Sequence, residues 1–258
     1  VAGAAAILAP LVWLARRARS GRHAWPARRD LGYLALCAFF GVVLNQALFL
    51  EGIARTTPGH SALLNSQIPT FALVAAVLLG EERLSRRKLA SLLAGAAGVL
   101  VLLEVDRLRV AREWLAGDLL NLANAASYGL FVAMSRRVMA RTDPLAATAV
   151  LFAFGSVGMA LYGGRALAAA DLGALTARAW GSMAFALLGA TVLTYLLNLW
   201  ALARTTASRV ALWIFVQPVI AAAMSAGLTG ERITPRFVVA TGLVFAALFL
   251  QESPKQPW

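Results

Sequence analysis

The sequence predicts an all-α polytopic membrane protein, built as an inverted repeat of two five-helix halves. Of its 258 residues, 60% are hydrophobic and only 14% are charged. A soluble chain of this length could not bury so much apolar surface. The repeat is predicted because the stretch 54–83 recurs without a gap 149 positions later, as 203–232. The matching residues are Ala54-Arg55-Thr56-Thr57 with Ala203-Arg204-Thr205-Thr206, Ala62-Leu63 with Ala211-Leu212, Pro69 with Pro218, Leu79 with Leu228, and Glu82-Arg83 with Glu231-Arg232.

Nine apolar stretches are candidate membrane spans, each of which needs roughly 20 residues. They are Val1–Ala15, Leu31–Leu50, Ser61–Gly80, Leu89–Leu103, Gly117–Met134, Pro144–Tyr162, Gly181–Trp200, Val210–Leu228 and Phe237–Leu250. Five crossings separate the two copies of the repeat, so the copies are expected to enter the membrane from opposite sides. A period of five predicts ten spans, and the tenth is expected before Val1.

This period divides the chain into three parts. The first repeat is 1–103, which lacks its first helix, and the second repeat is 117–251. The linker 104–116 mixes arginines with apolar residues, which predicts either an amphipathic segment on the membrane surface or a solvated loop.

Several helix starts carry a capping side chain. Thr57, Asp143 and Thr234 each precede a proline, which suits the first helical position. Asp30 and Ser85 are candidate caps for two further helices.

The basic residues predict the orientation in the membrane. Lys and Arg number 24 against 12 Asp and Glu, and they lie between apolar runs rather than in a nucleic-acid-binding patch. If the loop 16–30 is cytoplasmic, 16 of the 24 fall in inside loops and 8 in outside loops. This bias predicts a cytoplasmic C-terminus. We expect the protein to be a multi-pass protein of the inner membrane. The single cysteine, Cys37, lies in an apolar run and is expected to be a packing residue.

Polar side chains inside the spans predict a central cavity, because lipid cannot satisfy them. Asn121, Asn124 and Tyr128 share one helix face. Hydrogen bonding between helices is the alternative for any one of these residues. Pro69 and Pro218 are predicted hinges, with a static kink as the alternative. The full predicted substrate-binding set is Asn45, Gln46, Asn65, Gln67, Asn121, Asn124, Tyr128, Tyr195, Asn198, Trp213 and Gln217.

Ionisable residues are absent from the middle of every predicted span. Glu82 and Asp118 fall at helix ends, and His60 is expected in a loop. This pattern predicts a neutral or zwitterionic organic solute without proton coupling. The sequence has no phosphate-binding loop, no metal-ligand cluster and no nucleophilic serine motif, so we expect no cofactor, no metal and no enzymatic activity.

The motifs Ala54-Arg55-Thr56-Thr57, Pro69 and Leu79-Gly80-Glu81-Glu82-Arg83-Leu84 have second-half partners in Ala203-Arg204-Thr205-Thr206, Pro218 and Gly230-Glu231-Arg232-Ile233. With these motifs the chain resembles the EamA-type branch of the drug/metabolite transporter superfamily over nearly its whole length. The resemblance implies ten spans, cytoplasmic termini, and a cavity lined by the first, third, fourth, sixth, eighth and ninth family helices.

The expected function is therefore export or facilitated movement of a small metabolite, such as an amino acid, by alternating access between inverted repeats. The alternative is a non-transporting membrane receptor or assembly module with a dry, packed centre. The expected partners are the lipid bilayer and a small-molecule substrate but not nucleic acid, with a homodimer left open.

Overall fold

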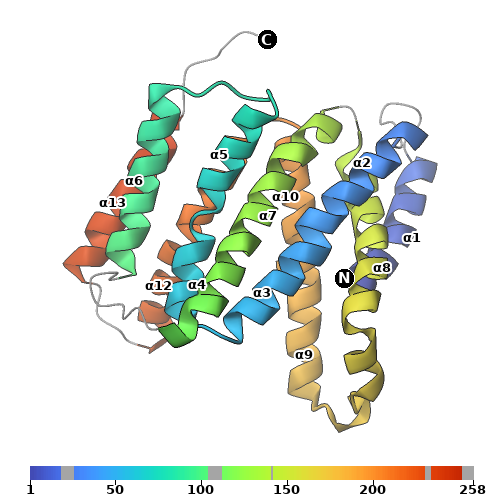
Figure 1. Ribbon diagram of the computed structural model, residues 1–258. Helices are drawn as coiled ribbons and strands as arrows, with labels where there is room; N and C mark the ends of the chain where they lie inside the picture. Colours follow the sequence, from blue (N-terminus) through green and yellow to red (C-terminus); the bar gives the residue numbers. More distant parts are fainter. Residues whose placement is uncertain (19–25, 104–111, 141, 230–233, 252–258) are drawn as a thin grey trace. The chain divides into compact units, whose positions relative to one another are not determined.

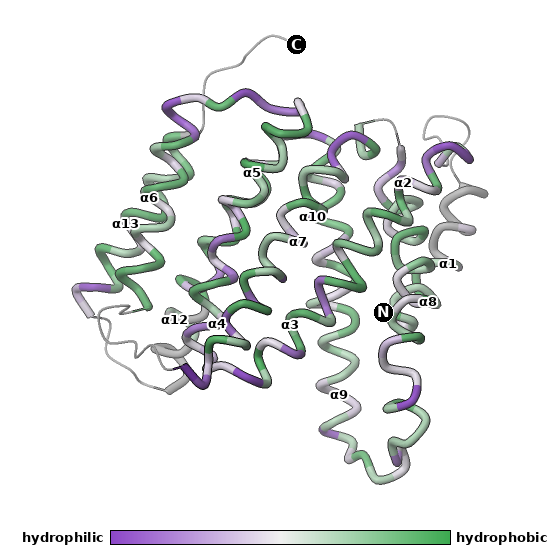
Figure 2. Tube along the Cα trace, viewed as in Figure 1, coloured by the Kyte–Doolittle hydropathy of each residue, from purple (hydrophilic) through white to green (hydrophobic). Residues whose placement is uncertain are grey.

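The computed structural model describes residues 1–18, 26–103, 112–140, 142–229 and 234–251. Within these ranges every regular element is a helix, which confirms the all-α class (Figure 1). Figure 2 shows hydrophobic residues along the helices and hydrophilic residues gathered at many of their ends. Four helical stretches in this part of the chain are long and apolar enough to cross a membrane: Arg28–Ile53, Pro58–Leu78, Pro144–Ala169 and Ala177–Leu202.

Each of the nine predicted spans corresponds to helical structure in the described ranges. In chain order these are α1 (Ala2–Ala18); α2, a π-helical turn and α3 (Arg28–Ala38, Phe39–Leu44, Asn45–Ile53); α4 and α5 (Pro58–Asn65, Ile68–Leu78); α6 (Arg86–Leu102); α7 (Leu115–Met139); α8 (Pro144–Ala169); α9, a second π-helical turn and α10 (Ala177–Phe185, Ala186–Leu193, Thr194–Leu202); α11, a 3-10 turn and α12 (Ala207–Leu212, Trp213–Phe215, Val216–Thr229); and α13 (Pro235–Gln251). Two further 3-10 turns are Arg112–Trp114 and Leu172–Ala174. Most of the predicted surface linker, 104–111, lies outside the described residues.

Local cap chemistry explains where four of these helices begin. The side-chain oxygens of Thr57, Ser85, Asp143 and Thr234 each accept a hydrogen bond from a backbone N–H of the first turn. The prediction for Asp30 is wrong, because α2 begins two residues earlier and Asp30 lies inside its first turn. A carboxylate there still faces the positive end of the helix dipole.

The chain packs as two compact units, the first comprising Val1–Ala47 and Met134–Thr205. Within it α8 is the central helix and contacts α1, α2, the first π-helical turn and α10. Its buried core joins α1, α8 and the second π-helical turn through Ala4, Leu8, Phe152 and Val192.

The second unit comprises Leu48–Ala133 and Thr206–Trp258. Helices α6 and α13 lie side by side (Figure 1), and α5 contacts α11. The buried core of this unit consists of Val99, Leu212, Phe215, Val219 and Val244. Each unit contains segments from both sequence halves, so the packing units differ from the halves 1–103 and 117–251. The division into those halves rests on sequence recurrence and stays a prediction.

Helix boundaries recur at the spacing seen in the sequence. Helices α6 and α13 both contain 17 residues, and their first residues are 149 positions apart. The stretches Arg28–Ile53 and Ala177–Leu202 both contain 26 residues and start 149 positions apart. Each contains a π-helical turn, and the two turns end at Leu44 and Leu193, again 149 positions apart. The recurrence therefore extends from residue identities to local backbone conformation.

Candidate functional site

Two spans of the second unit are interrupted near their centres. The first is interrupted between α4 and α5 at Ser66 and Gln67. In the second, the 3-10 turn Trp213–Phe215 separates α11 from α12. The last residue of each interruption, Gln67 and Phe215, lies at nearly the same position of the repeat, because α5 and α12 begin 148 positions apart. At the first interruption the Gln67 N–H donates to the Leu64 carbonyl at 3.0 Å, a tighter turn than that of an α-helix. Many transporters have their solute site beside such discontinuous helices.

The hydrogen bonds of the side chains at the first break, among the described residues, are to neighbours along the chain. Ser66 Oγ donates to the Leu63 carbonyl at 2.5 Å. The Gln67 amide makes long contacts, 3.4 Å to Ser66 Oγ and 3.5 Å to Thr70 Oγ1. Both Gln67 and the predicted site residue Asn65 are half-buried. Weakly held amides of this kind can exchange their local contacts for a solute.

The second break presents Trp213 and Gln217, which lie one helical turn apart on one face. Trp213 is 62% exposed, and Gln217 is also exposed. An amide facing lipid in the middle of a span would lose its hydrogen bonds, so this exposure favours a water-filled space beside the break.

The two predicted hinge residues lie where a helix restarts. Pro69 is in the first turn of α5, and Pro218 is in the first turn of α12. A proline at such a position has no intrahelical hydrogen bond to remove. The discontinuity of each span thus precedes its proline, and the hinge role stays a prediction.

Helix α7 supplies three predicted site residues, and they differ in their surroundings. Asn121 is fully buried; its amide oxygen accepts from Ser61 Oγ at 2.9 Å and its nitrogen donates to the Gly117 carbonyl at 3.0 Å. Asn121 therefore ties α4 to α7. Asn124 is buried, and the Tyr128 ring lies 5.4 Å from that of Phe131 between centroids.

The remaining four predicted residues belong to the first unit. Tyr195 donates its hydroxyl to the Gly41 carbonyl at 2.5 Å, and its ring packs edge-on against Phe152. Asn45 and Gln46 begin α3 directly after the π-helical turn and are half-buried, as is Asn198 on α10.

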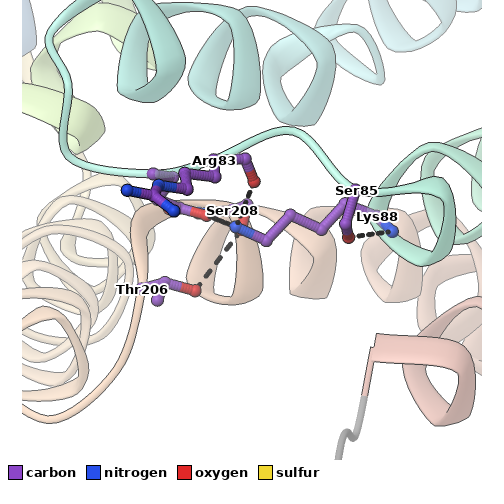
Figure 3. Close-up of polar contacts among 6 residues, drawn as sticks. Arg83, Ser85, Lys88, Thr206 and Ser208 are labelled. Carbon is purple, nitrogen blue, oxygen red and sulfur yellow. Dashed lines mark hydrogen bonds and ion pairs between the residues drawn. The ribbon is translucent and has the colours of Figure 1, made fainter. Parts of the chain in front are cut away.

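A buried ionic cluster joins the chain after α5 to the start of α11. The sequence analysis did not predict this cluster. Glu82 accepts from the backbone N–H of Ser208 at 2.9 Å, from Ser208 Oγ at 2.5 Å and from Lys88 Nζ at 2.6 Å. Figure 3 shows Lys88 and Ser208 at this cluster, with the neighbouring Thr206 hydrogen-bonded to Ser208. The side chain of Glu82 is only 3% exposed. The sequence feature that could have drawn attention to Glu82 is its recurrence as Glu231 in the second repeat. Glu231 itself lies outside the described residues.

Gly80 brings Glu82 into this position. It ends α5 with φ of 72°, a left-handed conformation that favours glycine, and the next two N–H groups return to the Ala76 carbonyl. The chain thus turns sharply out of the helix and directs the carboxylate toward α11.

A second polar cluster lies at the start of α4. The prediction that His60 lies in a loop is wrong: His60 is buried in the first turn of α4, because Thr57 and Pro58 start the helix before it. Its Nδ1 lies 3.0 Å from Asp118 Oδ2, and Thr56 Oγ1 donates to Asp118 Oδ1 at 2.5 Å.

Comparison with known proteins accounts for this architecture. The sequence model of the EamA-like transporter family matches residues 1–104 and 115–251. The chain belongs to the EamA-like transporter family. Its resemblance to the drug/metabolite transporter superfamily is therefore confirmed, and this EamA-like transporter is a multi-pass membrane protein.

Two curated relatives carry the name of transporter. The uncharacterized transporter YyaM of Bacillus subtilis is 21% identical over 195 residues, which cover 75% of this chain and 64% of that protein. An uncharacterized transporter of Archaeoglobus fulgidus is 22% identical over 224 residues, which cover 86% of this chain and 78% of the other. The match therefore spans less than two thirds of the length of the Bacillus protein.

A solved crystal structure shares the fold. It superimposes with a TM-score of 0.76 over 96% of this chain and 84% of its own, at 17% sequence identity. At that identity the likeness concerns the fold alone.

Proposed function

We propose that this EamA-like transporter exports, or facilitates the movement of, a small neutral or zwitterionic metabolite such as an amino acid. It would lie in the inner membrane with a cytoplasmic C-terminus and work by alternating access between inverted repeats. The observation that carries the proposal is the pair of interrupted spans in the second unit, with amide and aromatic side chains at both interruptions. Broken helices beside polar side chains are a hallmark of solute sites in secondary transporters.

The contacts between α6 and α13 support the inverted orientation of the repeats. Ser91 Oγ donates to the Ala247 carbonyl at 2.6 Å, and a Cβ on Gly98 would lie 2.9 Å from the Ala240 carbonyl oxygen. The helices are therefore antiparallel. Ser91 and Ala240 occupy one position of the repeat, and Gly98 and Ala247 another, each pair 149 residues apart. Exchanging the two repeats therefore turns the contact between Ser91 and Ala247 into the contact between Ala240 and Gly98. A two-fold axis that relates the repeats requires this correspondence.

The chemistry at the breaks favours an uncharged or zwitterionic solute. Asn65, Gln67 and Gln217 offer both donors and acceptors, and the Trp213 indole offers an apolar face with one N–H donor. Glu82 and Asp118, by contrast, lie at helix ends and are engaged by protein side chains. The solute would be held by hydrogen bonds and stacking rather than by a countercharge, and no step requires covalent chemistry.

Transport assays on reconstituted protein test this proposal. We expect proteoliposomes to release loaded amino acids, and we expect Gln217→Ala and Trp213→Ala to slow release by about tenfold, the effect of roughly 1.4 kcal/mol. Because both side chains are exposed, their replacement should leave the melting temperature within about 2 °C. Asn121→Ala is the contrasting variant and should lower the melting temperature, because it removes the acceptor of the buried Ser61 hydroxyl.

The opposite outcome would favour a non-transporting assembly module. That reading requires the wild-type protein to move none of a panel of amino acids and other neutral metabolites. It also requires the Gln217 and Trp213 variants to behave as stability mutants. If the wild type transports and both variants transport equally well, the site assignment is wrong while the transporter proposal stands.

A further inference from the structure

An open groove lies where the end of α3 meets the first turns of α7, apart from the residues predicted to bind the solute. Its volume is about 550 Å³, and it is lined by Glu51, Arg55, Ala116, Leu119 and Leu120. All five residues belong to the second unit. The lining is apolar except for one acidic and one basic side chain.

The segments that carry the lining residues pack closely next to the groove. A Cβ on Gly52 would lie 2.5 Å from the Asn121 amide nitrogen, and a Cβ on Gly117 would lie 2.6 Å from the Arg55 carbonyl carbon. Only glycine permits this approach, so α7 is in close contact with α3 at Gly52 and with the turn after α3 at Arg55. These contacts hold the backbone segments that carry the lining residues close together.

The charged pair is accessible at the mouth of the groove. Arg55 Nη1 donates to the Glu51 carbonyl oxygen at 2.6 Å and also to the Glu51 carboxylate. The two side chains are 49% and 44% exposed. An exposed pair of this kind contributes little to stability, so its partners can be exchanged at low cost.

Exposed apolar residues from the same two helices accompany the pair. Leu50 and Ile53 on α3 are 43% and 38% exposed, and Leu115 and Leu119 on α7 are 55% and 57% exposed. In a chain that crosses the membrane, such side chains meet acyl chains. The ion pair lies at the end of a predicted span, which is the depth of lipid headgroups.

We propose that this groove binds a zwitterionic phospholipid with a primary ammonium group, such as phosphatidylethanolamine. The lipid phosphate would accept hydrogen bonds from the Arg55 guanidinium, the lipid ammonium would donate to the Glu51 carboxylate, and an acyl chain would lie along Leu119 and Leu120. The negative phosphate of this headgroup is thus opposite the positive Arg55, and its positive ammonium is opposite the negative Glu51. An anionic lipid would instead leave Glu51 facing a phosphate without compensation.

The repeat supplies an internal control. Arg204 and Trp200 lie 149 positions after Arg55 and Glu51. Arg204 Nη1 donates to the Trp200 carbonyl at 3.0 Å, and its guanidinium lies 4.0 Å from the centre of the Trp200 ring. The helix-end hydrogen bond is thus the same, but an indole replaces the carboxylate. Arg204→Gln removes the equivalent bond without touching the groove.

Native mass spectrometry of the purified full chain, with defined lipids added in detergent, tests the proposal. We expect the wild type to retain phosphatidylethanolamine roughly tenfold better than phosphatidylcholine, whose methylated ammonium cannot donate, and better than anionic phosphatidylglycerol. Glu51→Gln should abolish the preference for ethanolamine over choline. Arg55→Gln should weaken retention of both lipids, whereas Arg204→Gln should behave as the wild type.

Several results would overturn the inference. Equal retention of ethanolamine and choline lipids by the wild type would do so, as would a preference that survives Glu51→Gln. If a free amino acid, which has no phosphate, competes the lipid away, the groove is a vestibule for the solute and the lipid assignment fails. The readout does not depend on transport, so failure of the proposed function would leave it unaffected.

Discussion

Replacing Glu82 tests whether the buried ionic cluster stabilises the second unit. The carboxylate accepts two hydrogen bonds from Ser208 and one from Lys88, and its side chain is 3% exposed. Breaking a fully buried pair costs about 3–5 kcal/mol. Lys88 remains 21% exposed and can turn toward water, which lowers the expected loss for Glu82→Ala to about 3 kcal/mol. Glu82→Gln keeps an acceptor for the Ser208 N–H and should lose about 1 kcal/mol.

Thermal unfolding in detergent, followed by tryptophan fluorescence, measures these differences. For a chain of this size about 1 kcal/mol corresponds to 2–4 °C, so Glu82→Ala should lower the melting temperature by roughly 6–12 °C. Glu113→Ala removes an exposed carboxylate and should change it by less than about 1 °C.

Double replacement with Ser208→Ala separates the contact from general effects of the substitution. We expect the loss in the double variant to fall short of the sum of the single losses by about 1–2 kcal/mol. Strict additivity, or a Glu82→Ala protein as stable as the Glu113 variant, would refute the reasoning.

Three further predictions concern the repeat. Gly98→Leu should lower the melting temperature by several degrees, because the new side chain collides with the Ala240 carbonyl, and about 1–3 kcal/mol is typical of such overpacking; an unchanged melting temperature would contradict the close contact. In a cysteine-free background, Ser85→Cys and Thr234→Cys should react with a membrane-impermeant maleimide from opposite sides of the membrane, and labelling from one side would exclude inverted repeats. Deleting one residue from the π-helical turn Phe39–Leu44 should convert the turn to α-helix. We expect this variant to insert into the membrane but to release no solute from proteoliposomes. Retained release would show that the turn is dispensable.

Features that depend on short stretches of sequence could be predicted well. Hydrophobic runs gave the positions of the helices, because burial in lipid depends on composition and length. Caps such as Thr57 and Asp143 were predictable because the capping oxygen lies within three residues of the N–H it accepts from. Asp30 was the exception, since α2 begins before it. The family could be inferred because its motifs recur within the chain.

Features that depend on contacts between distant residues could not be predicted. Asn121 and Gln217 are both amides inside spans, yet one is bonded at both ends of its amide and the other is exposed. Nothing in their local sequences distinguishes them. Tyr195 reaches the carbonyl of Gly41, 154 positions away, and Glu82 reaches Ser208, 126 positions away.

The sequence by itself determined the class, the helices and the recurrence of this protein, because these follow from hydrophobicity and hydrogen bonds between near neighbours. Only the tertiary structure decided which polar groups are satisfied within the protein and which remain available to a ligand. The reason is physical: a buried donor needs an acceptor within about 3 Å, and folding determines which distant residue supplies it.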